Sequence, residues 1–443
     1  PVLRADDRSD LISAVRHGDR DGLATLLKKG VDVNVTEPDG STALMWASYR
    51  DDGESAALLI RAGANVDIAN ELGATALWAA SMNGSASMVV RLLQAGANPN
   101  LALLAGETPV MVASRSGSAD VVEQLLSKGA DVNAHGARHQ TALMWAVSQK
   151  HPDVVKVLLA HGADVQARSD EWGYVQAVPP HGRLEYNRSI PHGGDTALLF
   201  AARVGDLESA RLLVGAGANV NDADAWGVSA LVLAAHSGFG DLVEFLLDKG
   251  ADANSAAAGF TALHEAIMRR DEKMVMALLA HDADPNTPLR TWTPTRRSST
   301  DWNFPPQFIG ASPYWLAARF TQPSVMRALV KGGANPRFVQ HADFYPDGPP
   351  EHRVETITPL MAATGLGGGR GWVVPDRSQR EALMLETVKL VMEVDVDVNV
   401  AAADGRTALD AAQTLKYQSV IEFLVGKGAK PGPKKKPPSP VNP

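Results

Sequence analysis

Cysteine is missing from all 443 residues of the sequence. Its absence excludes disulfide bonds, thiolate metal sites and cysteine nucleophiles. The sequence also lacks any apolar run of the roughly 18–20 residues that a membrane span requires, so we expect no span. Basic residues are outnumbered, with 42 Lys and Arg against 50 Asp and Glu and a net charge of −8. General nucleic-acid binding needs a basic surface that displaces counterions, so we expect no nucleic-acid partner.

Motifs for catalysis or cofactor binding are equally scarce. No Gly-x-Ser-x-Gly elbow occurs, and His264-Glu265 is not followed by the second histidine of a zinc helix, because position 268 is Met. The glycine-rich run 365–371 lacks the Lys-Ser/Thr pair of a phosphate-binding loop. The acidic run 222–227 would need an acidic residue where Leu233 stands to form a calcium loop. We therefore expect no catalytic residue, no cofactor and no metal, and a protein that is not an enzyme.

Metal-capable side chains do gather in two segments, but their spacing matches no known site. They are His181 and His192 in one segment and His341, Asp343, Asp347, Glu351 and His352 in the other.

The sequence does contain a period of 33 residues. Triplets of the type Thr-Ala-Leu recur along it, and a Gly-Ala-Asp-Val-Asn segment recurs in step with them. Self-similarity at this period predicts a stack of repeats whose interior grows along one axis. The triplets begin at Thr42, Thr75, Thr108, Thr141, Thr196, Ser229, Thr261, Ser312, Thr358 and Thr407, and the early glycine segments begin at Gly30, Gly63, Gly96, Gly129 and Gly162.

Residues 108–133 show what one repeat encodes. Thr108 suits a helix N-cap, and Pro109 suits the first helical position, where a missing N–H has no cost. After a turn at Gly117, apolar residues at 121, 122, 125 and 126 form the stripe of a second amphipathic helix. Gly129 suits its left-handed end. Glycines two residues before most of the Thr positions predict a tight hairpin tip.

These residues resemble the ankyrin repeat, whose signature is Thr-Pro-Leu-His-x-Ala-Ala followed by Gly-Ala-Asp-Val-Asn. The resemblance implies an all-α solenoid with β-hairpin tips, covering about 11 units. The signature histidine occurs only at His264, and Met, Trp, Leu, Val or Asp stands at the other equivalent positions. Segments 293–297 and 312–319 resemble an ankyrin subfamily of bacterial, exported proteins. That likeness implies a periplasmic or extracellular location, with the cytoplasm as the alternative.

The regular spacing predicts the domain organisation and breaks at four long loop insertions. We expect an N-terminal capping repeat at 1–34, regular repeats at 35–166, an insertion at 167–194, repeats at 195–286, an insertion at 287–310, a repeat at 311–336, an insertion at 337–356, a repeat at 357–399 with an internal insertion at 365–380, a C-terminal capping repeat at 400–430 and a proline- and lysine-rich tail at 431–443.

The insertions carry many aromatic residues, which indicates ordered loops. Two interpretations stay open: the aromatics form a recognition patch, or they fold each loop back onto the repeats. Trp46, Trp78, Trp145 and Trp315 recur beside the signature-histidine position and are expected in the core or lining a groove. The candidate partner-binding residues are Trp172, Tyr174, Tyr186, Trp226, Trp292, Trp302, Phe304, Phe308, Tyr345 and Trp372.

The leading hypothesis is a rigid, non-catalytic scaffold that binds a protein partner through its concave face, hairpin tips and insertions. The alternative is a self-assembling structural protein that forms head-to-tail homo-oligomers or filaments. A third hypothesis places a small-molecule or metal pocket within the insertions. The sequence does not name the partner.

Overall fold

The computed structural model describes residues 5–176, 187–292, 304–345, 352–368 and 376–433. The chain divides into two compact units, which we describe separately. Unit 1 consists of Pro1–Glu171 and Gly193–Asp222, and unit 2 consists of Trp172–His192 and Ala223–Pro443.

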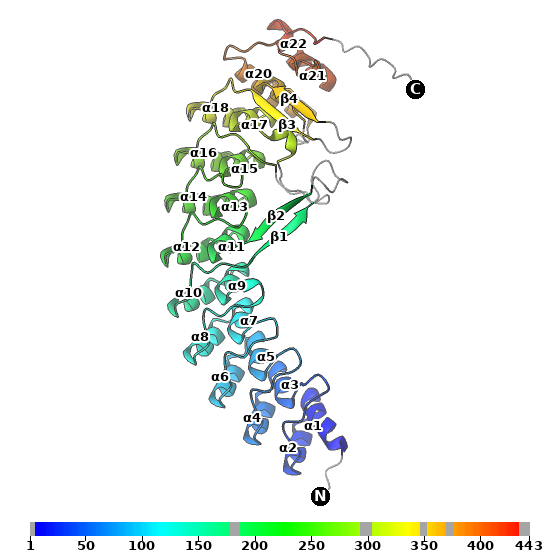
Figure 1. The fold of residues 1–443 in the computed structure, drawn as a ribbon, viewed down its shortest axis with the longest axis vertical. Helices are drawn as coiled ribbons and strands as arrows, with labels where there is room; N and C mark the ends of the chain where they lie inside the picture. Colours follow the sequence, from blue (N-terminus) through cyan, green and yellow to red (C-terminus); the bar gives the residue numbers. More distant parts are fainter. Residues whose placement is uncertain (1–4, 177–186, 293–303, 346–351, 369–375, 434–443) are drawn as a thin grey trace, which may run out of the picture. The chain divides into compact units, whose positions relative to one another are not determined.

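Unit 1 is built from pairs of short antiparallel helices (Figure 1). We call the odd-numbered helix of each pair the first helix and the even-numbered one the second helix. They are α1 (Ala5–His17), α2 (Arg20–Lys28), α3 (Ala43–Tyr49), α4 (Gly53–Arg61), α5 (Ala76–Met82), α6 (Ala86–Gln94), α7 (Pro109–Ser116), α8 (Ala119–Ser127), α9 (Ala142–Ser148), α10 (Pro152–Ala160), α11 (Ala197–Val204) and α12 (Leu207–Gly215), with a 3-10 turn η1 (Ala137–His139) before α9.

The repeated threonines begin the first helices, as the sequence predicts. Thr42, Thr75, Thr108 and Thr141 each accept a hydrogen bond from the backbone N–H three residues later. Several second helices begin with an aspartate instead; Asp52, for example, accepts from the N–H of Ser55. Each cap satisfies one of the donors that a helix start leaves free, and its loss typically costs about 1 kcal/mol.

The helices of unit 1 pack in two layers. First helices α3, α5, α7 and α9 contact one another in order, and so do second helices α4, α6, α8 and α10. A leucine recurs every 33 residues between the layers and is fully buried each time, at Leu59, Leu92, Leu125 and Leu158. Truncating such a leucine to alanine typically costs about 2–5 kcal/mol, so these positions hold the layers together.

Asparagine side chains connect each repeat of unit 1 to the next. The Asn100 Nδ2–H donates to the carbonyl of Gly129 at 2.9 Å, and its Oδ1 accepts the N–H of Asp131 at 2.8 Å. Asn133 makes the same two bonds to Gly162 and Asp164. The asparagine four residues after the glycine that ends a second helix, Asn100 after Gly96 and Asn133 after Gly129, therefore sets the register between neighbouring repeats.

Unit 2 continues the same pattern of paired helices. They are α13 (Ala230–Ser237), α14 (Gly240–Asp248), α15 (Ala262–Arg269), α16 (Glu272–Ala280), α17 (Pro313–Arg319), α18 (Pro323–Lys331), α19 (Pro359–Ala363), α20 (Arg377–Val391), α21 (Ala408–Leu415) and α22 (Gln418–Gly426), with a 3-10 turn η3 (Pro306–Phe308) before α17.

Two of the insertions contain β-strands, which corrects the all-α prediction and its loop insertions. The first holds β1 (Glu171–Gln176) and β2 (Arg188–Gly193), and the third holds β3 (Gln340–Phe344) and β4 (Arg353–Ile357). Each pair forms a two-stranded sheet, and β3 and β4 pair antiparallel with Gln340 opposite Ile357. In the fourth insertion, α20 already begins at Arg377, so its last residues are helical.

The tips before the first helices are tighter than the predicted β-hairpins. Among the described tips that carry no strand pair, strand-like pairing appears as isolated bridges, Thr36 with Thr42 and Ala223 with Ser229. Gly73 explains why one tip needs glycine. Its φ is +87°, and a Cβ there would lie 2.8 Å from the carbonyl oxygen of Ala102 in the next tip. The tips of neighbouring repeats thus approach too closely for a side chain at this position.

Candidate partner-binding surfaces

The first insertion presents an exposed aromatic cluster. Trp172 and Tyr174 are two residues apart on β1, so their side chains point to the same face of the sheet. The ring of His192 on β2 stacks on Trp172 at 5.8 Å and meets Tyr174 edge-on at 6.3 Å. Trp172 is nevertheless 38% exposed and Tyr174 57% exposed. The sheet therefore holds two large aromatic side chains in place without covering them.

The other predicted contact residues lie in different environments. Trp226 is half-buried and packs edge-on against Phe260 at 5.9 Å, whereas Trp292 and Tyr345 are half-buried near their insertions. Tyr186, Trp302 and Trp372 lie outside the described residues. Phe304 and Phe308 are only 1% exposed. Because their side chains belong to the interior, the prediction that these two residues contact a partner is wrong for this structure.

Phe308 belongs to what we call the insertion core of unit 2, together with Trp315, Phe320 and Gln340, whereas Phe304 packs against Phe260 at 5.6 Å and His264 at 6.2 Å. Phe308 meets Trp315 at 5.8 Å and Phe320 at 5.7 Å, both edge-on. The Trp315 Nε1–H donates to the carbonyl of Ile357 at 3.0 Å, at the end of β4. The buried Gln340 donates from Nε2 to the carbonyls of Gln307 and Ile309, at 2.7 and 2.8 Å.

The fourth insertion also packs on this core. A Cβ on Gly367 would lie 2.9 Å from the Trp315 ring. Described parts of the second, third and fourth insertions thus meet around α17. For these segments, the interpretation in which aromatics fold the insertion back onto the repeats fits the structure better than a recognition patch.

His264 is a structural residue of the same unit. It is fully buried, and its Nδ1 accepts the backbone N–H of Thr261 at 3.1 Å, which completes a reciprocal cap at the start of α15. Burial lowers the pKa of His264 to about 4, and the smaller opposing influence of the Thr287 and Ala311 carbonyls does not offset it. The ring is therefore neutral at pH 7. Its neighbour Glu265, also buried, pairs with His236 at 3.1 Å.

Three ion pairs of unit 1 share a marked asymmetry in exposure. Arg115 pairs with Glu107 at 3.1 Å, Arg168 with Asp222 at 2.8 Å and Arg203 with Asp195 at 2.8 Å. The arginine side chains are 46%, 42% and 44% exposed, whereas the carboxylates are 13%, 8% and 7% exposed. Each pair thus turns its cation toward solvent and its anion toward the protein.

Aromatic rings support two of these arginines. The Arg115 guanidinium lies 4.8 Å from the centre of the Trp145 ring, and that of Arg203 lies 5.6 Å from the centre of Phe200. Trp145 is itself fixed, because its Nε1–H donates to Gln140 Oε1 at 3.1 Å. Near the start of the unit, Arg16 stacks on Trp46 at 4.3 Å and pairs with Glu37 in the same way.

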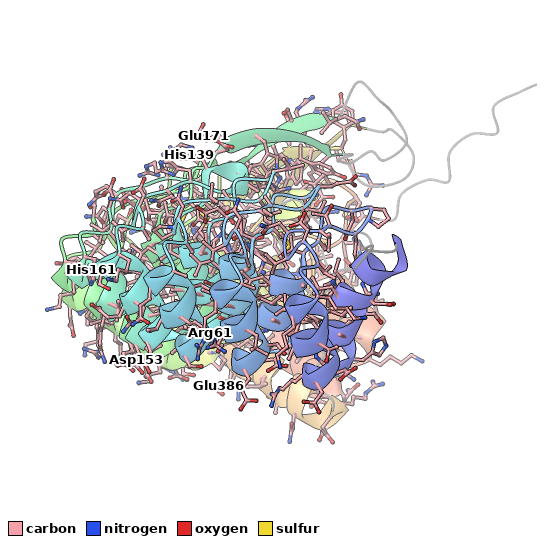
Figure 2. All side chains as sticks on the ribbon, turned by 90° about the horizontal axis from the view of Figure 1, so that it is seen from below. Arg61, His139, Asp153, His161, Glu171 and Glu386 are labelled. Carbon is pink, nitrogen blue, oxygen red and sulfur yellow. The ribbon has the colours of Figure 1, made fainter. Side chains whose placement is uncertain are left out.

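Sequence reasoning missed these arginines, although a signal existed. Arg115 and Arg203 each stand seven residues after the threonine that begins their helix, at the end of a first helix. Figure 2 separates the tip side of unit 1, where His139 and Glu171 lie, from the second helices, where Arg61, Asp153 and His161 lie. We call Arg115, Trp145, Arg168, Phe200 and Arg203 the arginine–aromatic surface.

The described residues offer few groups that suggest another kind of site. Within the residues that the structure describes, no group of three or more His, Cys, Asp or Glu side chains is arranged to hold a metal ion. Of the metal-capable residues in the third insertion, His352 pairs with Asp343, while Asp347 and Glu351 lie outside the described residues. No helix in the described part of the chain combines the length and the apolar character needed to cross a bilayer.

Comparison with protein families agrees with the repeat geometry. The family described as "Ankyrin repeats (3 copies)" matches residues 11–102, 78–169 and 185–288, which together make up more than half of the chain. The chain belongs to the ankyrin-repeat family. Ankyrin repeats are typically non-catalytic modules that bind other proteins, and bacterial origin or export does not follow from the match.

Two curated relatives are similar over part of their length. One is the "Putative palmitoyltransferase ZDHHC13" of Danio rerio, 27% identical over 274 residues, or 56% of this chain and 38% of the relative. The other is the "Ankyrin repeat, SAM and basic leucine zipper domain-containing protein 1" of Mus musculus, 36% identical over 95 residues, or 20% of each chain. The chain thus spans well under half the length of both relatives.

Proposed function

We propose that this ankyrin-repeat protein is a non-catalytic scaffold that binds a protein partner. The observation that carries the proposal is the exposed aromatic cluster of Trp172, Tyr174 and His192 on the β1–β2 sheet. Large aromatic side chains supply much of the energy of protein interfaces when a partner covers them. A ring already held by its neighbours loses little conformational entropy on binding, so the sheet favours association.

Unit 1 carries a second, separate proposed contact surface at its tips. Leu72 and Leu104 are exposed at consecutive tips, and the N–H of Leu104 donates to the carbonyl of Leu72 at 2.9 Å. This bond fixes one tip against the next. The half-buried Trp226, Trp292 and Tyr345 are proposed to contribute at the margins, and the roles of Tyr186, Trp302 and Trp372 stay predictions.

Catalysis is not part of the proposal. The chain covers 38% of the palmitoyltransferase named in the first relative, so the activity in that name is not carried over.

The test is partner capture with matched variants. Replacing Trp172 and Tyr174 by Ala should reduce recovery of the protein partner from the native source by at least tenfold, measured by affinity purification and quantitative mass spectrometry. The control replaces Met276 and Val330, which are exposed on second helices α16 and α18, by Ala. Equal recovery by the aromatic variant, the control variant and the unchanged protein would refute the proposal.

Self-assembly is the second candidate, because the β3–β4 sheet leaves Val354 58% exposed on a strand. Exposed strands of this kind pair readily with a second chain. Light scattering separates the two functions. A single species of about 47 kDa at all concentrations would exclude assembly, whereas growth with concentration would support it.

We also propose a periplasmic or extracellular location, on the sequence likeness to exported ankyrin proteins alone. Fractionation of the native cells, followed by immunoblotting, tests it. Recovery with the cytoplasmic marker would overturn this location without affecting the binding proposal.

A further inference from the structure

The tip before α9 contains two histidine rings that stack face to face. The ring centres of His135 and His139 lie 3.6 Å apart, with 14° between the ring planes. Both residues are exposed, and Figure 2 places His139 on the tip side of unit 1. Two neutral rings pack well at this distance, whereas two imidazolium ions in the same position repel each other. The stack therefore accommodates one added proton more readily than two.

The backbone of the same tip is strained. His139 stands two residues before Thr141, where most other tips have glycine, and its φ is +56°. The preceding Arg138 also has left-handed backbone angles, with φ +57° and ψ +31°. Residues with a Cβ rarely adopt this conformation, and two in succession persist only where surrounding contacts hold them. The closed tip thus depends on its contacts, and the histidine stack is one of them.

The tip also holds the start of the first insertion. The carbonyl of Arg138 accepts the N–H of Asp170, the residue before β1, at 2.9 Å. Within the tip, the N–H of Gly136 donates to the carbonyl of Gln140 at 2.8 Å, and the N–H of His139 donates to that of Gly136 at 3.1 Å. Opening the tip therefore also breaks the bond to Asp170.

The two rings have no charged partner at contact distance. Among the described residues, none forms an ion pair or a hydrogen bond with the ring of His135 or His139. The charged residues on the tip and on the neighbouring segments of unit 1 are the pairs Glu107–Arg115, Arg168–Asp222 and Arg203–Asp195, together with Asp131, Arg138, Asp170 and Glu171.

These neighbours do not explain a response between pH 5.5 and 7.5. Carboxylates and guanidinium groups ordinarily keep their charge in this range, whereas histidine gains a proton as the pH falls through it. A change of the tip over this range therefore reports the two rings.

We propose that the His135–His139 stack makes this tip a pH-sensitive latch, closed at neutral pH and opened when both rings are protonated. The open tip separates the rings and takes up the second proton, which the stack disfavours. Because opening binds up to one further proton, its equilibrium constant rises as the pH falls, by up to about tenfold per pH unit. Acidification thereby releases Asp170 and loosens the start of the first insertion. The latch goes beyond the proposed scaffold function and does not depend on it.

Hydrogen exchange of the full chain tests the latch. Exchange is followed by mass spectrometry at pH 7.5, 6.5 and 5.5 and corrected at each pH for the intrinsic rate of an unprotected amide, which gives the opening constant. We expect the opening constants of residues 135–140 and of Asp170 to rise at least fivefold between pH 7.5 and 5.5.

A matched control lies in the same chain. The N–H of Glu71 donates to the carbonyl of Asp39 at 2.8 Å, in the corresponding bond between two tips that contain no histidine. The opening constant of Glu71 should change less than twofold over the same pH range. An equal rise at both places, or no rise in residues 135–140, would overturn the proposal.

Two substitutions assign the rise to the stack. His135→Phe keeps a ring that can stack on His139 but cannot take up a proton, so the rise should disappear. His161→Phe removes a histidine at the end of second helix α10 and should leave the rise unchanged. A rise that persists in His135→Phe, or that disappears in His161→Phe, contradicts the proposal. If a variant misfolds, the unchanged protein still gives the answer, because the histidine-free tips are its internal reference.

Discussion

His264 shows how one buried side chain ties stability to pH. An unfolded histidine has a pKa near 6.5, whereas burial lowers the pKa of His264 to about 4 in the folded protein. Between these values the unfolded chain binds more protons, so the stabilisation present above pH 6.5 is lost as pH falls toward 4. The full loss is about 3 kcal/mol, since each pKa unit corresponds to about 1.4 kcal/mol.

The His264→Met variant tests this coupling, because Met stands at the equivalent position in four other repeats. The free energy of unfolding of both proteins is measured in urea at pH 7.5, 6.0 and 4.5. Because both proteins contain the same carboxylates, the difference between them reports the histidine alone. We expect the free energy of unfolding of the wild type to fall relative to that of the variant as the pH falls. A difference that stays constant across the three pH values would show that His264 is not held neutral by burial.

Also at the residue scale, substitutions at Gly63 and Gly73 distinguish the cost of backbone strain from the cost of crowding. Both have positive φ, +87° and +89°, but a Cβ at Gly73 meets the Ala102 carbonyl at 2.8 Å, whereas one at Gly63 meets nothing within 4 Å. Gly63→Ala should cost about 1 kcal/mol, the usual penalty of a left-handed alanine. Gly73→Ala should cost about 2 kcal/mol or more, because the neighbouring tip must also move. Equal urea midpoints for the two variants would contradict the close packing of the tips.

At the scale of elements, Gln340 joins the third insertion to the second. Its Nε2 supplies the donor for two carbonyls, of Gln307 and Ile309, and its side chain is fully buried. Gln340→Ala should destabilise this region by about 2 kcal/mol or more, since it leaves two partly buried carbonyls without a donor and each fully buried one would cost about 1–3 kcal/mol. Amide exchange at Phe308 and Ile309 should accelerate at least tenfold. The adjacent exposed His341→Ala is the control and should change exchange less than twofold.

The repeated elements could be predicted because their signals are local. Thr108 and Gly129 act within a few residues of themselves, so helix starts and ends follow directly from sequence. The insertions depend on contacts between distant residues, such as Trp315 with Ile357, 42 positions away. Burial in β3 alternates with period two, at Gln340, Ala342 and Phe344, but the polar Gln340 interrupts the alternation of apolar residues that would have predicted this strand from sequence.

The candidate site residues, too, could be predicted from the sequence only in part. The high aromatic content of the insertions led to the choice of Trp172 and Tyr174, which are exposed in the structure, and of Phe304 and Phe308, which are buried. The composition of a loop does not indicate which of its side chains face the repeats. The arginine of the pair Arg168–Asp222 has its partner 54 residues away, across an insertion, so no local pattern indicated it.

For the whole molecule, we expect the two compact units to respond separately to local damage. Gly73 lies in unit 1 and Gln340 in unit 2, and the two residues share no contact partner. Changes at distant sites without shared partners usually combine additively. In a chain carrying both Gly73→Ala and Gln340→Ala, the exchange rates should therefore match those of each single variant within its own unit. Faster exchange in a unit that holds no substitution would show that the units unfold together.

The side-chain amides that bridge successive turns in unit 1 also limit how such a gene can grow or shrink. Asn100 and Asn133 each reach the turn of the following repeat, so these turns depend on their predecessors for a donor and an acceptor. Duplicating or deleting a whole 33-residue module keeps this relation at both new junctions. The first insertion also keeps a bond of this kind, because Gln166 Nε2–H donates to the carbonyl of Gly217, 51 positions away, at 2.9 Å. We therefore expect lineages of this protein to differ in unit 1 by whole modules or by insertions that return the chain to the same turn.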